Sequence, residues 1–223
     1  MKSYNLQWYV DKLKSGEPFS LARYGDGEML CMWGKKGGNS NGWRYSPELR
    51  EALLDSMKHE NDPTFIYGMQ RVLPHDAERI QDEYPNINWH DTEIFSEAVA
   101  SGELYPLIEQ LRKMPTVIIG NKTIKPIKEL LNSAAFIEVP PYNSYDDRER
   151  IIGWIKDIGH NYTFLFSCGM AANAFISELH SELPYANLID VGHIWDPFVG
   201  LMSRCDLEGK TKEDIEMNLH EKT

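Results

Sequence analysis

The chain has 223 residues, of which 42% are hydrophobic and 26% are charged, so we expect a globular protein with a large core. Its formal net charge of −11 disfavours nucleic acid and anionic membrane surfaces as partners, and an anionic ligand would need a local cation. No apolar run approaches the roughly 20 residues that span a bilayer, and the charged N-terminal segment lacks the apolar region of a signal peptide.

Short apolar segments alternate with segments of helical pattern along the chain. The predicted strands are Phe19–Tyr24, Thr64–Gly68, Thr116–Gly120, Ala135–Val139, Thr163–Ser167 and Asn187–Val191. The predicted helices are Pro47–Lys58, Pro74–Glu83, Asp91–Ala100, Tyr105–Lys113, Ile124–Leu131, Asp146–Ile158 and Ala171–His180. Apolar runs without strict alternation are typical of strands buried on both faces, and strands that alternate with helices indicate parallel pairing.

We therefore predict a single α/β domain over residues 1–205. Its fold would be Rossmann-like, with a mainly parallel sheet of about six strands flanked by helices. Residues 206–223 form a polar tail, in which Thr211–Glu221 would either form a short helix capped by Thr211 or fray. The Gly- and Asn-rich segment Gly34–Tyr45 is either a flexible surface connection or a mobile lid over a ligand.

The three cysteines are Cys31, Cys168 and Cys205. Their odd number and wide spacing argue against a disulfide framework and against a cysteine-based zinc site. A reducing, cytoplasmic setting therefore fits the sequence best.

Polar and Gly-rich segments follow the predicted strands. They are Tyr24–Glu28, Gly120–Lys122, Pro140–Ser144, Ser167–Met170 and Gly192–Pro197. Because ligands of open parallel sheets bind beyond the carboxyl ends of the strands, we expect these segments to build one site.

Asp26 and Glu28 follow the first of these strands, between Gly25 and Gly27. If the chain stays extended there, both carboxylates point to one side, and a magnesium or manganese ion would relieve their repulsion. The two glycines would let a donor phosphate approach the backbone closely. The alternative is an acidic turn without a metal.

Arg23 lies inside an apolar run, where a charge is costly unless it is paired. It either forms an ion pair with Asp26 or Glu28 or contacts a donor phosphate.

Ser167, Gly169 and Met170 lead from a strand directly into a helix. Free backbone N–H groups at such a helix start favour a phosphate, so we predict donor binding here. The alternative is a plain connection in which the glycine serves packing.

Asp190, His193 and Asp196 form a last cluster, and they are candidates for a metal ligand, a substrate clamp or the general base of catalysis. A buried histidine with a capping aspartate is the structural alternative. Five aromatic residues lie in or near loops at the same edge, where their rings would either pack or stack on a sugar or a nucleobase: Trp33, Trp43, Tyr142, Tyr145 and Trp195.

Two blocks of the sequence resemble the GT-D-type glycosyltransferases, a Rossmann-like family with an Asp-x-Glu metal motif after the first strand. The first block is FSLARYGDGEML, and the second comprises TFLFSCGMAANAFISEL and NLIDVGHIWDPF. Asp26 and Glu28 match the metal motif, and Asp190 and His193 match the Asp-x-Gly-His turn. The chain departs from the pattern at Trp195, since family members often read Gly-His-Ile-Asp.

The resemblance implies an enzyme that uses a divalent metal to transfer a sugar from a nucleotide-diphosphate sugar, often UDP-linked. We expect a hydroxyl acceptor on a glycan or glycoprotein; the alternative is a hydroxymethylated DNA base, as in phage enzymes. A non-catalytic nucleotide-binding module and a methyltransferase are the rival interpretations. The sequence is also compatible with a homo-oligomer.

Overall fold

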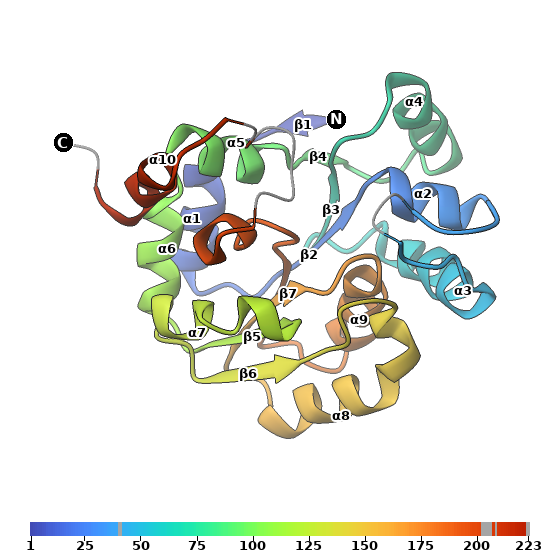
Figure 1. Cartoon of the computed structure of the whole chain (residues 1–223). Coiled ribbons are helices and arrows are strands. Elements are labelled where there is room, and N and C mark those ends of the chain that lie inside the picture. Colours follow the sequence, from blue (N-terminus) through green and yellow to red (C-terminus); the bar gives the residue numbers. More distant parts are fainter. Residues whose placement is uncertain (40–41, 202–206, 208, 222–223) are drawn as a thin grey trace.

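The computed structural model describes residues 1–39, 42–201, 207 and 209–221. These residues form one sheet in which every paired strand runs parallel to its neighbour, with helices on both faces (Figure 1). The order across the sheet is β1-β4-β3-β2-β8-β7-β5-β6. The strands are β1 (Lys2–Ser3), β2 (Ser20–Tyr24), β3 (Phe65–Met69), β4 (His90–Asp91), β5 (Thr116–Gly120), β6 (Ala135–Glu138), β7 (Thr163–Ser167) and β8 (Asn187–Asp190).

The described α-helices are α1 (Leu6–Ser15), α2 (Asp26–Met32), α3 (Pro47–Asp55), α4 (Pro74–Glu83), α5 (Ile94–Ser101), α6 (Tyr105–Arg112), α7 (Ile127–Leu130), α8 (Arg148–Ile158), α9 (Ala171–His180) and α10 (Lys212–Glu216). The 3-10 helices are η1 (Ser56–His59), η2 (Lys122–Ile124), η3 (Ser144–Asp147), η4 (Asp196–Val199) and η6 (Met217–Leu219).

The prediction of an α/β fold with a mainly parallel sheet is confirmed, and all six predicted strands are present. The sheet has eight strands rather than about six because β1 and β4 also join it. Each of these two contains only two residues, too few to leave a periodic pattern in the sequence. Helices α1 and α2 were also not predicted.

Successive residues of the central strands enter separate cores on the two faces of the sheet. Ala22 and Tyr24 of β2 pack in the core beneath α2, α3, α8 and α9, whereas Leu21 packs in the core beneath α1, α5 and α6. In β7, Phe164 and Leu165 divide between the same two cores. This burial on both faces explains why the strands read as apolar runs.

A crevice opens between β2 and β8 at the carboxyl edge of the sheet. The chain leaves β2 into α2 on one face and leaves β8 toward Ile194 and Trp195, which pack in the other core. The two strands pair only at Ser20 and Leu21, although β2 runs on to Tyr24. The crevice is therefore the switch point at which an open parallel sheet of this kind binds a ligand.

The side chain of Asn173 replaces the missing strand partner in this crevice. The main-chain N–H of Arg23 donates to Asn173 Oδ1 at 3.1 Å, and Asn173 Nδ2 donates to the Arg23 carbonyl at 2.8 Å. Asn173 is 1% exposed, so helix α9 is fixed to β2 through two buried hydrogen bonds.

At the C-terminal end, Thr211 caps α10 by accepting a hydrogen bond from the main chain of Asp214. Ile215 of this helix packs in the core beneath α1, α5 and α6. None of the helices in the described ranges is long and apolar enough to cross a membrane. Cys205 lies outside the described residues, while Cys31 and Cys168 are buried and unpaired.

Candidate functional site

Three adjoining pockets lie at the carboxyl edge of the sheet, and His193 lines all three. The carboxylate pocket is lined by Asp26, Glu28 and Asp190. The aromatic pocket is lined by Trp43, Tyr142 and Asp196. The arginine pocket is lined by Arg23, Arg71 and Ser96. The predicted site residues therefore gather at one edge, but they divide among three spaces.

Asp26 and Glu28 lie at the start of a helix, so the expectation that the chain stays extended there is wrong. Gly25 is the N-cap of α2, and its N–H donates to Glu28 Oε2 at 2.9 Å. The N–H of Gly27 donates to Asp26 Oδ1 at 2.8 Å. Each carboxylate uses one oxygen to satisfy a main-chain donor at the helix start, and both still line the same pocket.

The carboxylate pocket favours a cation. Burial is the main cause that raises the pKa of Glu28 to about 7. Main-chain hydrogen bonds oppose this rise, and the negative charges of Asp190 and Asp26 add smaller increases. Carboxylate oxygens are the ligands that magnesium and manganese prefer. In the described part of the chain, no three His, Cys, Asp or Glu side chains form a complete metal site. The donor set fits a magnesium-like ion that keeps waters and takes further ligands from a phosphate.

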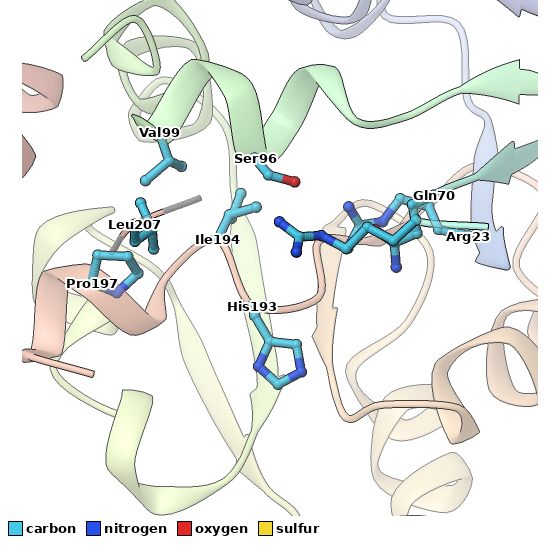
Figure 2. A pocket seen from close by; sticks show the side chains of 9 residues that line it. Arg23, Gln70, Ser96, Val99, His193, Ile194, Pro197 and Leu207 are labelled. Carbon is cyan, nitrogen blue, oxygen red and sulfur yellow. The ribbon is translucent and has the colours of Figure 1, made fainter. Parts of the chain in front are cut away.

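Arg23 pairs with Asp190 rather than with Asp26 or Glu28. Its Nη2 lies 3.5 Å from Asp190 Oδ1, and the two side chains are 2% and 8% exposed. The guanidinium also lies 5.6 Å above the ring of Phe95. Figure 2 shows it pointing into the arginine pocket, toward Ser96 and His193.

The turn after β8 depends on a glycine. Gly192 has φ +54°, and a Cβ at this position would collide with Nη2 of Arg23. The Gly192 N–H donates to Asp190 Oδ1 at 2.8 Å, and its carbonyl accepts a hydrogen bond from the Ser167 hydroxyl. These contacts join the ends of β7 and β8.

Gly169 and Met170 line the carboxylate pocket immediately before α9, and Ser167 lines the aromatic pocket. Gly169 has φ +61°, and a Cβ there would lie 2.5 Å from the Trp43 ring. The glycine therefore serves packing against Trp43, while it also leaves the start of α9 open to the pocket. Burial raises the pKa of the neighbouring Cys168 thiol well above its usual value, which argues against a nucleophilic role.

His193 and Asp196 form a hydrogen-bonded pair. The distance from His193 Nδ1 to Asp196 Oδ2 is 2.8 Å, and the side chains are 31% and 10% exposed. An ionised Asp196 accepts the proton on Nδ1, and Nε2 is then the ring atom that takes up a proton. This arrangement is the one that orients a histidine as a general base.

The described part of the segment Gly34–Tyr45 is folded against the domain. Gly38 and Arg44 form an antiparallel bridge, and Arg44 Nη2 lies 2.6 Å from Asp146 Oδ2. Asn39 and Trp43 form part of the wall of the carboxylate pocket.

Several pocket or supporting residues were not predicted from the sequence, among them Asn39, Gln70, Arg71, Ser96 and Asn173. Arg71 has φ +50°, and its main-chain N–H donates to Glu93. Gln70 and Arg71 directly follow β3, so the rule that ligands bind beyond strand ends was sufficient to find them.

No protein-family model and no curated protein matches the chain. Three solved structures are similar to it, each over 89% of its length. A selenomethionine-substituted structure of domain of unknown function 1792 is 16% identical with a TM-score of 0.69, and 80% of that chain is covered. A second, described as showing that this highly conserved domain has a distinct glycosyltransferase fold, is 18% identical with a TM-score of 0.67 and 80% coverage.

The third is described as a new glycosyltransferase of the same domain from Streptococcus sanguinis. It is 20% identical with a TM-score of 0.69, and 83% of that chain is covered. At these identities the likeness establishes a shared fold. The chain therefore has the α/β fold that is described, for one of these structures, as a distinct glycosyltransferase fold.

Proposed function

We propose that the protein is a metal-dependent glycosyltransferase that moves a sugar from a nucleotide-diphosphate sugar, UDP-linked, to a hydroxyl acceptor. The proposal rests mainly on the position of His193. It lines the carboxylate pocket together with Asp26 and Glu28, and it lines the adjoining aromatic pocket together with its hydrogen-bond partner Asp196. The shared fold with structures described as glycosyltransferases supports it.

Asp26 and Glu28 would hold the manganese or magnesium ion. When bound, such an ion neutralises the charge of the leaving diphosphate. Glu28→Gln would retain the oxygen that accepts the Gly25 N–H, and Asp26→Asn would retain the one that accepts the Gly27 N–H. These two variants therefore remove charge without removing the local hydrogen bonds.

The start of α9 would receive the donor phosphates. Gly25 and Gly27 allow close backbone approach on one side, and Gly169 and Met170 present the helix start on the other. Ser167 would stabilise the strand ends next to this region, because its hydroxyl donates a hydrogen bond to the Gly192 carbonyl.

His193 is the proposed general base, and Asp196 is the positioning residue. Nε2 of His193 would take the proton of the acceptor hydroxyl. The acceptor oxygen would then bond to the anomeric carbon while the bond from that carbon to the diphosphate oxygen breaks. Asp190 is less suited to act as the base, because its Oδ1 accepts from both Gly192 and Arg23.

Thermal unfolding with UDP, GDP or S-adenosylmethionine, each with and without manganese, tests the proposal. A ligand at about 100 times its Kd stabilises by about 2.7 kcal/mol, which corresponds to a Tm shift on the order of 5–10 °C for this size. We expect a shift with UDP that requires manganese and that is lost in both Asp26→Asn and Glu28→Gln. Glu48→Gln, in the first turn of α3, is the matched control. A metal-independent shift with S-adenosylmethionine would instead favour a methyltransferase.

A cytoplasmic location is also proposed. The two described cysteines are buried and unpaired, as expected for a reducing compartment. Burial raises the pKa of the Cys31 thiol to about 11, which keeps it protonated and unreactive.

A further inference from the structure

The aromatic pocket is large enough to hold one ring of a ligand. It encloses about 270 Å³, whereas the carboxylate pocket encloses about 80 Å³. Ligand pockets of proteins enclose roughly 300–1,000 Å³, so the volume of the aromatic pocket is just below that range. The carboxylate pocket has room for a metal ion and phosphate oxygens only.

The lining of the aromatic pocket matches an uncharged, polyhydroxylated ring. Tyr142 lines this pocket and is 59% exposed. Leu201 adds a second exposed apolar surface at 41%. The neutral side chains of Asn121 and Thr123 add hydrogen-bonding groups. The described lining includes no Lys or Arg, so a phosphate would find no counter-charge there.

The aromatic pocket also contains the proposed catalytic pair. His193 and Asp196 line it. Because Nδ1 of His193 donates a hydrogen bond to Asp196, Nε2 is the ring atom that can accept a proton. A ring bound against Tyr142 in this pocket would lie beside the residue that removes a hydroxyl proton.

We infer that the aromatic pocket is the acceptor subsite and that the acceptor is a neutral saccharide whose ring packs against Tyr142. This inference rests on the proposed function, because it assumes that the reacting hydroxyl of the acceptor lies beside the general base His193. A DNA acceptor is disfavoured, since the described lining residues include no Lys or Arg to bind a phosphate backbone.

The test uses ligand-observed saturation-transfer NMR with four methyl glycosides, those of glucose, galactose, mannose and N-acetylglucosamine. Each is titrated with and without saturating UDP and manganese, and methyl glucuronide serves as the charged counterpart. We expect at least one neutral glycoside to bind, to remain bound when UDP and manganese are present, and to bind more tightly than the glucuronide.

Tyr142→Ala should weaken glycoside binding roughly 3- to 10-fold, the effect of losing one stacked ring, while the affinity for UDP stays unchanged. Tyr142→Phe should bind like the wild type. Tyr185→Ala is the matched control, because Tyr185 is 71% exposed and lies two residues before the start of β8, at the opposite edge of the sheet.

Two results would overturn the inference while leaving the proposed function intact: binding of UDP without binding of any neutral glycoside, or weaker UDP binding in Tyr142→Ala. The second result would assign the pocket to the donor nucleoside. A third result is glycoside binding that depends on Tyr142 in a protein that does not bind UDP. This result would contradict the proposed function but would still support a saccharide-binding site in the aromatic pocket.

Discussion

Replacing Asn173 with alanine tests whether this one side chain stabilises the fold by fixing α9 to β2. The substitution removes both partners of the Arg23 main chain, the acceptor at 3.1 Å and the donor at 2.8 Å. Each buried main-chain group left without a partner costs about 1–3 kcal/mol. Water that enters from the crevice would form hydrogen bonds with these two groups and offset part of the cost. We therefore expect the free energy of unfolding to fall by about 3 kcal/mol.

Urea denaturation measures this loss as a lower midpoint with an unchanged slope. The corresponding fall in Tm is about 6–12 °C for a chain of this size. Asn161→Ala, at an exposed position, is the control and should change the free energy of unfolding by less than about 0.5 kcal/mol. An Asn173→Ala variant as stable as this control would refute the role assigned to Asn173.

The remaining predictions concern pH, backbone strain and the catalytic pair. Burial lowers the pKa of His90 from 6.5 in the unfolded chain to about 4 in the folded protein. Between these two pH values the unfolded chain binds the proton more tightly than the folded protein does. The contribution of His90 to the free energy of unfolding is therefore complete above pH 6.5 and is lost as the pH falls toward 4. The loss of unfolding free energy between pH 7.5 and 4 should be about 2–3 kcal/mol smaller in His90→Phe than in the wild type. Gly192→Ala should lower the free energy of unfolding by about 2–4 kcal/mol, because it combines φ +54° with a clash against Arg23, whereas Gly153→Ala, in open space within α8, should not destabilise. Asp196→Asn should lower kcat about 10- to 100-fold with little change in the affinity for UDP; an unchanged kcat contradicts its positioning role.

Much of the fold could be predicted because the signals were local. The apolar runs of β2 and β7 are long enough to be recognised, and Ser46 with Pro47 marks the start of α3. Helix α1 was not predicted, although Leu6, Tyr9, Val10 and Leu13 follow helical spacing after the cap Asn5.

Helix α2 was harder to predict, because Gly25 and Gly27 disfavour a helix and a Gly-Asp-Gly sequence is typical of a turn. The spacing between Gly25 and Glu28 does match a capping box, but a glycine cap leaves only half of that signal in the sequence. Tertiary packing of Met29 and Met32 in the core outweighs the low helix propensity.

The location of the site followed from the rule that ligands bind at strand ends, but its division into three pockets did not. The Arg23–Asp190 pair joins residues that are distant in the sequence and requires β2 to lie beside β8, which no local pattern encodes. The proximity of His193 and Asp196 could be predicted from the sequence more easily, because both residues belong to one turn.

Release of UDP from UDP-sugars, with and without manganese, tests the central claim most directly. UDP-glucose, UDP-galactose and UDP-N-acetylglucosamine would be compared in the wild type, Glu28→Gln and the control Glu48→Gln. We predict release by the wild type and by Glu48→Gln that requires manganese, and a loss of at least 100-fold in Glu28→Gln. Equal release by Glu28→Gln, or binding of UDP without turnover of any donor sugar, would contradict the assignment of a metal-dependent glycosyltransferase.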